Sequence, residues 1–195
     1  MAIPSHITAE NFSGRFILNK TLSDNPDAVL AIQGIGYLMR KTMAMATPQM
    51  DVHQSTDDSG TVHLTLAVTV GGKEANNELS MDWNPVTKED GPFGAVERRS
   101  RYCAISEIDL ACSGANASFL KGQTLADGHT PSAWLEEAAG QRNIQLYGKG
   151  VKDGWTYEQV WGFEEIGGKR YHTRRIVAVH GNKDARARYV YEFVN

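Results

Sequence analysis

Strict alternation of apolar and polar side chains constrains the fold of this chain more than any other feature of its sequence. Apolar residues occupy every second position from Val62 to Val70, and His63, Thr65 and Thr69 stand between them. Successive side chains of a strand point to opposite faces, so this segment is predicted to be a half-buried β-strand. Other strands are predicted at residues 15–19, from 49 onward, and at 78–83, 94–104, 144–151, 155–166, 169–180 and 185–194.

Two short helices are predicted between the first strand and residue 49. The sequence from Ser23 to Asp27 is typical of a helix start, because Pro26 is tolerated in a first turn. The glycines at Gly34 and Gly36 then separate two helical segments, 27–33 and 37–46. We therefore predict a helix–turn–helix within residues 24–46.

A segment without the strand pattern, residues 106–140, interrupts the second half of the chain. Its last part begins with a capping threonine, Thr130, and ends with Gly140, which predicts one further short helix. No linker or repeat divides the 195 residues, of which 41% are hydrophobic. The chain is therefore predicted to form a single domain, residues 1–195.

Charge and targeting features limit the possible partners. The chain has 20 Lys and Arg against 23 Asp and Glu, a net charge of -3 that favours neither nucleic acid nor an anionic membrane as a partner. Clusters of arginine are interpreted mostly as solvated strand faces: Arg98, Arg99 and Arg101, and Arg170, Arg174 and Arg175.

Residues 1–10 have no secretory pattern and no apolar run is long enough to span a membrane, so a cytoplasmic protein is expected. Cys103 and Cys112 are either two thiols or, in an exported protein, a disulfide.

Several motifs occur in the order found in one family. Asn11-Phe12-Ser13-Gly14-Arg15-Phe16 is similar to the opening strand of the intracellular lipid-binding proteins, the fatty-acid-binding-protein group of calycins in the lipocalin superfamily. Residues 25–30, Gly34 to Gly36 and Pro48 then resemble that family's lid helices and its entry into the second strand. The resemblance covers residues 11–104 and 142–195. It implies a single calycin-type β-barrel of about ten antiparallel strands, capped by two helices and enclosing a ligand.

One feature of the family is missing. Its carboxylate clamp is an Arg-x-Tyr on the last strand, and the sequence from Arg186 to Tyr191 nowhere has that spacing. This departure argues against a simple fatty-acid carrier.

The predicted hairpin at Gly167-Gly168 fixes which side chains face the lumen. A two-residue turn places Ile166 opposite Lys169. The aromatic face is then predicted to point inward: Trp155, Tyr157, Gln159, Trp161 and Phe163 on one strand, opposite His172, Arg174, Ile176 and Ala178 on the next. If residues 181–184 form the following loop, Ala185 pairs with His180 and Arg174 lies opposite Tyr191, while Arg186, Arg188 and Glu192 face water. Tyr189, Tyr191 and Phe193 would then also point inward.

Arg174, His172 and Tyr191 are the predicted catalytic residues. A guanidinium inside a barrel is costly unless a ligand, a carboxylate or water pairs with it. A bulge would instead turn Arg174 outward. His172 is either a structural histidine or a proton shuttle.

The remaining lumen residues are predicted to bind the ligand: Trp155, Tyr157, Gln159, Trp161, Phe163, Ile176, Tyr189, Phe193, and on the second helix Met39 and Met43. The aromatic residues are alternatively core packing, and the methionines helix packing.

No catalytic motif of a hydrolase, metalloenzyme, nucleotide-binding protein or dehydrogenase occurs, so no cofactor and no metal are expected. Two functions fit a hydrophobic small molecule in the lumen: a carrier of a fatty acid, sterol or other lipophilic ligand, or a cofactor-free cyclase or isomerase of a polyketide or terpenoid metabolite. The missing clamp, the polar groups among the lumen aromatics and the insertion favour the enzyme. An interaction module ranks third, and a monomer and a homodimer both fit.

Overall fold

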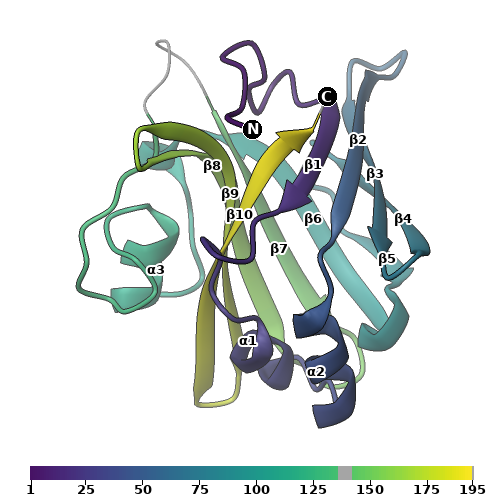
Figure 1. Ribbon diagram of the computed structural model, residues 1–195. Coiled ribbons are helices and arrows are strands. Elements are labelled where there is room, and N and C mark those ends of the chain that lie inside the picture. Colours follow the sequence, from purple (N-terminus) through teal and green to yellow (C-terminus); the bar gives the residue numbers. More distant parts are fainter. Residues whose placement is uncertain (136–141, 195) are drawn as a thin grey trace.

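Ten antiparallel strands form one continuous sheet in the computed structural model, which describes residues 1–135 and 142–194 (Figure 1). The strands are β1 (Gly14–Leu18), β2 (Gln49–Thr56), β3 (Val62–Val70), β4 (Lys73–Ser80), β5 (Val86–Glu89), β6 (Ala95–Cys103), β7 (Asn143–Gly150), β8 (Thr156–Ile166), β9 (Lys169–His180) and β10 (Lys183–Val194). The α-helices are α1 (Asp27–Ile32), α2 (Tyr37–Met45) and α3 (Gly114–Leu120). Short 3-10 turns lie at Gly91–Phe93 and Ile105–Glu107.

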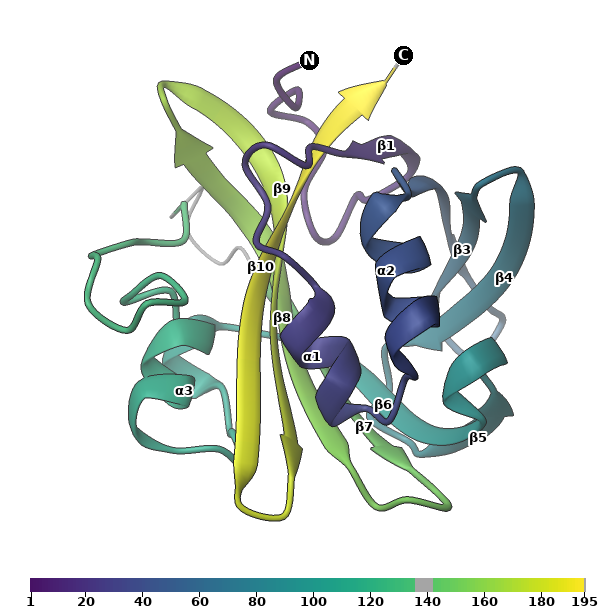
Figure 2. The same ribbon diagram turned by 60° about the horizontal axis from the view of Figure 1, so that its bottom comes forward.

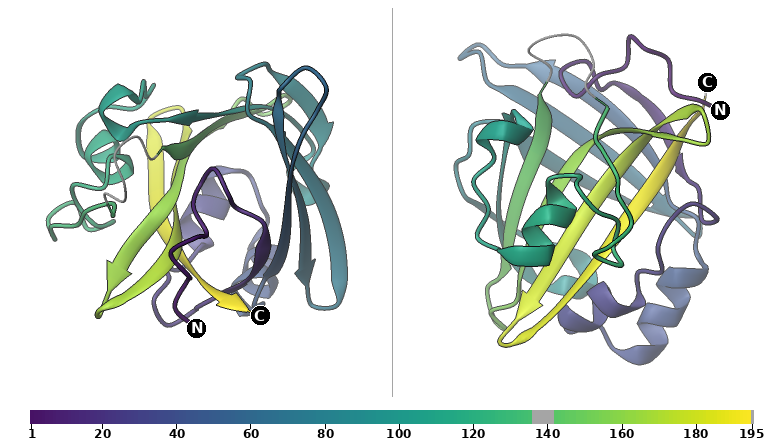
Figure 3. Two further views of the ribbon diagram at one scale, coloured as in Figure 1. Left: turned by 90° about the horizontal axis from the view of Figure 1, so that it is seen from above. Right: turned by 90° about the vertical axis from the view of Figure 1, so that its left-hand side faces the viewer.

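The sheet curls into a barrel, as the view from above in Figure 3 shows. The strand order is β4-β3-β2-β1-β10-β9-β8-β7-β6-β5, so the first and last strands pair in the middle of the sheet. The edge strand β4 meets β6 through isolated hydrogen bonds rather than a ladder: Ser100 Oγ of β6 donates to the Ser80 carbonyl at 2.8 Å, and Trp83 N, just after β4, donates to the Ser100 carbonyl at 2.9 Å. The predicted mainly β calycin-type barrel with a helical lid is confirmed.

Different segments cover the two ends of the barrel. Helices α1 and α2 lie across one end, shown from below in Figure 2, and α1 buries Val29 and Leu30 against the interior. The N-terminal segment lies at the opposite end, where Ile3 and Ile7 join the main apolar core. Arg170 holds this segment in place, because its guanidinium donates to the carbonyls of Pro4 and Ile7.

The predicted helices of the lid are confirmed, but other elements differ from prediction. Strand 78–83 is displaced, because β4 ends at Ser80 and the chain turns at Trp83, whose φ is 63°. Strand β5, four exposed residues without alternation, was not predicted. The expected helix at 130–140 is absent from residues 130–135, where an irregular segment pairs with Thr124, and its remainder lies outside the described residues. Among the described residues of the insertion, the α-helix is α3.

The predicted register of the β8–β9 hairpin is confirmed. Ile166 pairs with Lys169, Phe163 with His172 and Trp161 with Arg174. The next hairpin was predicted wrongly, because its loop contains two residues, 181 and 182, and Lys183 pairs with His180. Arg174 therefore lies opposite Tyr189 rather than Tyr191. A shift of two residues leaves every side chain on its predicted face.

The outer face of β8 and β9 is buried beneath residues 104–135, contrary to prediction. Figure 3 (right) shows α3 and its flanking loops lying over these strands. Phe119, Leu120 and Trp134 form a second apolar cluster with Val160 and Val177 of the outer face. The insertion thus gives the barrel wall a second layer.

A buried ion-pair network lies within this outer layer. Arg175 is fully buried, and its Nε donates to Glu164 Oε1 at 2.9 Å. Arg188 Nη1 donates to the other Glu164 oxygen at 2.9 Å, so Arg188 does not simply face water as expected. The interpretation of the arginine clusters as solvated was wrong for Arg175 and also for Arg98, which is buried beside Asn77 and Asp90.

Cys103 and Cys112 are both free thiols. Burial raises the pKa of Cys103 to about 11 and that of Cys112 to about 12. No helix among the described residues is long and apolar enough to cross a membrane.

Candidate active site in the barrel lumen

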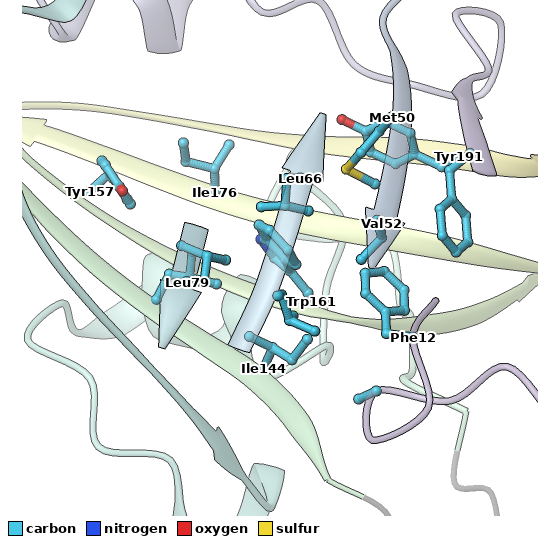
Figure 4. Packing of buried hydrophobic residues seen from close by; sticks show 14 of the residues in the cluster. Phe12, Met50, Val52, Leu66, Leu79, Ile144, Tyr157, Trp161, Ile176 and Tyr191 are labelled. Atoms are coloured by element: carbon cyan, nitrogen blue, oxygen red, sulfur yellow. The ribbon is translucent and has the colours of Figure 1, made fainter. Parts of the chain in front are cut away.

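The aromatic face of β8 points into the barrel, where it meets apolar side chains from the opposite wall. Trp161 and Phe163 are almost completely buried, and Trp161 pairs with Ile144 of β7 and belongs to the same apolar cluster as Leu66 of β3 (Figure 4). Trp155 stacks on Tyr157 with ring centroids 6.2 Å apart, and burial raises the pKa of Tyr157 to about 12. The lumen is therefore an apolar, aromatic-lined interior, as predicted.

Arg174 is a cation inside this interior. Its guanidinium carbon lies 3.5 Å from the centroid of the Trp161 ring and 5.0 Å from that of Tyr191. Its Nε donates to His172 Nε2 at 3.1 Å, and its Nη2 contacts Met50 Sδ. Among the described residues no carboxylate forms an ion pair with it. Burial lowers the pKa of Arg174 to about 10, so the group stays charged at neutral pH.

His172 lies beside Arg174 and is 1% exposed. Aromatic rings surround it, with the Phe12 centroid at 4.7 Å and the Tyr191 centroid at 5.5 Å. Its Nδ1 lies 3.0 Å from the Gly162 carbonyl oxygen. Burial, reinforced by the positive charge of Arg174, holds the pKa of His172 well below its usual value, so the ring is neutral.

A cavity of about 350 Å³ opens between the lid and the barrel wall. Leu30 of α1, Met43 of α2 and Leu18 of β1 form its apolar part, and Lys20 and Asp24 are among its polar groups. Tyr189 and Tyr191 of β10 also line it, so it adjoins the Arg174 site through Tyr191.

The structure brings several of the predicted site residues together. His172, Trp161 and Tyr191 surround Arg174, and Gln159 Oε1 accepts a hydrogen bond from Trp161 Nε1 at 2.8 Å. Ile176 lies in the same core cluster. Other predicted residues lie away from Arg174.

These more distant residues divide between the core and the surface. Trp155 packs on Phe93, and Phe193 packs on Phe16. Met39 is 49% exposed and does not line the lid cavity, because its helix turns that face toward solvent.

Two residues of the site were missed by the sequence analysis. Met50 contacts the guanidinium of Arg174, and Phe12 packs edge-on against His172. Both left a signal: Met50 alternates with Val52 at the start of β2, and Phe12 belongs to the Asn-Phe-x-Gly motif. The described residues contain no group of three His, Cys, Asp or Glu side chains placed to hold a metal.

Known proteins resemble this chain in sequence and in fold. No family model matches it. The pericyclase pydY of Acremonium sp is 26% identical over 100% of this chain and 97% of its own length. A probable pericyclase, scpY of Mollisia scopiformis, is 24% identical over 99% of this chain and 95% of its own.

Among solved structures, the fatty acid binding protein of Schistosoma mansoni in complex with arachidonic acid matches with a TM-score of 0.54 at 13% identity, covering 96% of this chain and 98% of that protein. The fluorescent protein UnaG matches with a TM-score of 0.52 at 11% identity, covering 95% and 99%. The protein therefore has the calycin fold of the fatty-acid-binding proteins and is similar, over its whole length, to two proteins named as pericyclases.

Proposed function

We propose that the protein is a cofactor-independent cyclase that closes a ring in a hydrophobic polyketide- or terpenoid-type substrate held in the lumen. Its full-length similarity to a pericyclase and a probable pericyclase supports this class of reaction. The resemblance to intracellular lipid-binding proteins favours a cytoplasmic location.

The observation that carries the proposal is the unpaired guanidinium of Arg174. Of its N–H groups, the one on Nε is bound to His172 and one on Nη2 faces Met50. Nη1 has no hydrogen-bond partner, and no carboxylate neutralises the charge within residues 1–135 and 142–194. Arg174 is half-buried, and the donors that the protein leaves unused are costly there unless water or a ligand oxygen accepts from them.

The arrangement suits a ring closure without a nucleophile. A pericyclic reaction forms its new bonds in one cyclic transition state, so the protein has to fold the substrate into the reactive geometry and polarise it. Arg174 donates to a carbonyl or enolate oxygen conjugated with the reacting double bonds, and withdraws electron density as charge develops there. The aromatic walls formed by Trp161 and Tyr191 restrict the conformation of the chain. Holding reacting atoms in a near-attack arrangement supplies several kcal/mol.

Tyr191 is placed to assist Arg174. Its ring lies beside both the guanidinium and the lid cavity, so its hydroxyl is proposed as a second donor to the substrate oxygen. The cavity under the lid would then take an apolar arm of the substrate, next to Leu30 and Met43.

The test uses the compound that accumulates when the gene is disrupted in its host. Incubated with the purified protein, this compound is expected to give a product of identical mass with a new ring, because pericyclic closure loses no atoms. Arg174→Met should lower the rate at least about 100-fold, the loss of one preorganised oxyanion donor. Arg15→Met, at an exposed arginine on the outer surface, is the matched control and should leave the rate unchanged. A compound that binds and is recovered unchanged would make the protein a carrier.

A further inference from the structure

We infer that His172 is a positioning residue that aims the guanidinium of Arg174, and that it does not transfer protons. The inference rests on the proposed role of Arg174 and adds a second layer to that site. It follows from the hydrogen bonds of the imidazole ring and from the way the barrel wall is supported behind it.

The two ring nitrogens of His172 have different partners, and these fix the tautomer. A carbonyl oxygen only accepts, so the contact between Nδ1 and the Gly162 carbonyl at 3.0 Å requires a proton on Nδ1. The Nε–H of Arg174 only donates, so the contact at 3.1 Å requires a lone pair on Nε2. One neutral tautomer satisfies both contacts at once.

This tautomer leaves His172 without a part in proton transfer. Its proton is bound to a backbone carbonyl, and its lone pair points at a permanent cation. The charged groups acting on the ring are Arg174 and Arg170, both positive, and its other neighbours are the rings of Phe12, Phe16, Trp161, Phe163 and Tyr191. Protonation would place a third positive charge among these groups, and no described carboxylate is there to stabilise it.

The effect of His172 on Arg174 is geometric. With Nε bound to His172 and Nη2 against Met50, the guanidinium plane is held between Trp161 and Tyr191. Nη1 is then the guanidinium nitrogen whose N–H groups remain available to a substrate oxygen. An arginine side chain loses considerable rotamer freedom when it is fixed, and fixing it before the substrate arrives removes that cost from the reaction.

The carbonyl that holds His172 is supported from outside the barrel. On either side of Gly162 the insertion and β7 bind the backbone of β8: Leu135 N donates to the Phe163 carbonyl at 2.8 Å, and Asn143 Nδ2 donates to the Trp161 carbonyl at 3.2 Å. Asn143 and Trp134 pack over Gly162 itself, so closely that a Cβ there would clash with Asn143 Nδ2 and lie 2.9 Å from the Trp134 ring. The insertion therefore contributes to the site by fixing the wall behind His172.

The tautomer can be measured without any substrate. In the 15N-labelled full-length protein, long-range proton–nitrogen spectra should show His172 protonated on Nδ1 only, with no change between about pH 5 and 9. The His172 signals are assigned by their loss in His172→Gln. A protonation step within this range, or a proton on Nε2, would overturn the inference.

Two variants separate positioning from proton transfer. Glutamine never titrates in this range but has a carbonyl that reaches the position of Nε2, whereas leucine has no acceptor. The Nε–H signal of Arg174 is assigned by its loss in Arg174→Met. In His172→Gln this proton should exchange with water within about threefold of the wild-type rate. In His172→Leu it should exchange at least about tenfold faster, since a hydrogen bond to a charged group is lost. His180→Leu, at an exposed histidine of the same strand, is the matched control.

Turnover of the accumulated compound completes the test. The positioning role predicts that His172→Gln retains most of kcat with a flat pH profile, while His172→Leu loses kcat with little change in KM. Equal loss in both variants would make His172 a proton carrier. The spectra decide the inference even if the protein turns over no substrate, so the two proposals fail separately.

Discussion

Arg174 and Arg175 are neighbours in the sequence. The structure nevertheless predicts that substitution by methionine changes the unfolding free energy very differently at the two positions. Arg175→Met removes one of the two arginines that pair with Glu164, which is 2% exposed, and four donated hydrogen bonds. Those bonds include the ones to the carbonyls of Phe119 and Thr124 at 2.7 Å. Arg188 still pairs with Glu164 in this variant, but the carbonyls of Phe119 and Thr124 lose their donor, and breaking one side of a buried ion-pair network costs about 3–5 kcal/mol.

Arg174→Met removes a cation that the protein holds at a cost. Its pKa falls from 12.5 to about 10, and at 1.36 kcal/mol per pKa unit the charged form is penalised by roughly 3 kcal/mol. A base with a depressed folded pKa destabilises the fold at every pH below about 10, and the penalty disappears as pH rises toward 12.5, so at pH 7 it is fully present. Contacts with Trp161 and Tyr191 offset about 2 kcal/mol and the bond to His172 about 1 kcal/mol. The unfolding free energy of Arg174→Met should therefore lie within about 1 kcal/mol of the wild-type value.

Urea unfolding at pH 7, followed by the fluorescence of the four tryptophans, measures both effects. Arg175→Met is expected to lower the unfolding free energy by about 3–5 kcal/mol and the Tm by roughly 10 °C, with the denaturant slope unchanged. Arg174→Met should have almost the wild-type midpoint. If Arg174→Met lost as much stability as Arg175→Met, the reasoning that one guanidinium is structural and the other is held for a ligand would be refuted.

Three further outcomes are expected. Gly162→Ala should lower the unfolding free energy by about 1–3 kcal/mol, because the new methyl clashes with the Asn143 amide and the Trp134 ring. A thermal scan with an unchanged Tm would contradict this close packing. Ala44→Trp should fill the cavity under the lid and weaken binding of the fluorescent probe 8-anilinonaphthalene-1-sulfonate about tenfold. Thr42→Trp, on the exposed face of the same helix, should leave probe binding unchanged. Equal binding by both variants would exclude the cavity as the probe's site. Since burial raises the pKa of Cys103 to about 11, iodoacetamide at pH 8 should label it only in the unfolded protein, and rapid labelling of the native protein would show that the thiol is accessible.

The inward face of the barrel could be predicted from the sequence because its alternation is strict and its hairpin is short. Once Gly167-Gly168 was identified as a two-residue turn, counting placed His172 and Arg174 correctly. The same method misplaced Tyr191, because either a two-residue or a four-residue loop fits the glycine at 181. Register within one hairpin is a local property, whereas the loop length of the next depends on packing that the sequence does not display.

The outer layer could not be predicted for a different reason. A strand with one face in solvent shows the same alternation as a strand whose polar face is covered by a loop. Here the covered face carries Glu164 and Arg175, so its sequence looks like that of an exposed face. Only the three-dimensional position of residues 104–135 shows that these charges are buried and paired. Strand β5 consists of four exposed residues, of which Val86 alone is apolar, so it shows no alternation.

The pairing of β1 with β10 has a consequence for how the molecule opens. Hairpins such as β8–β9 join residues close in sequence and lose little chain entropy when they form, whereas Arg15 pairs with Val194 from the other end of the described chain. Strand β1 has only five residues, yet it connects β2 to β10 and so joins the two halves of the sheet. We expect this seam to be the last part of the barrel to close during folding and the first to open by a partial fluctuation, so that its amide protons exchange with solvent sooner than those of β8 and β9. An enclosed product would then leave through a transient opening of the wall at β1, beside the lid.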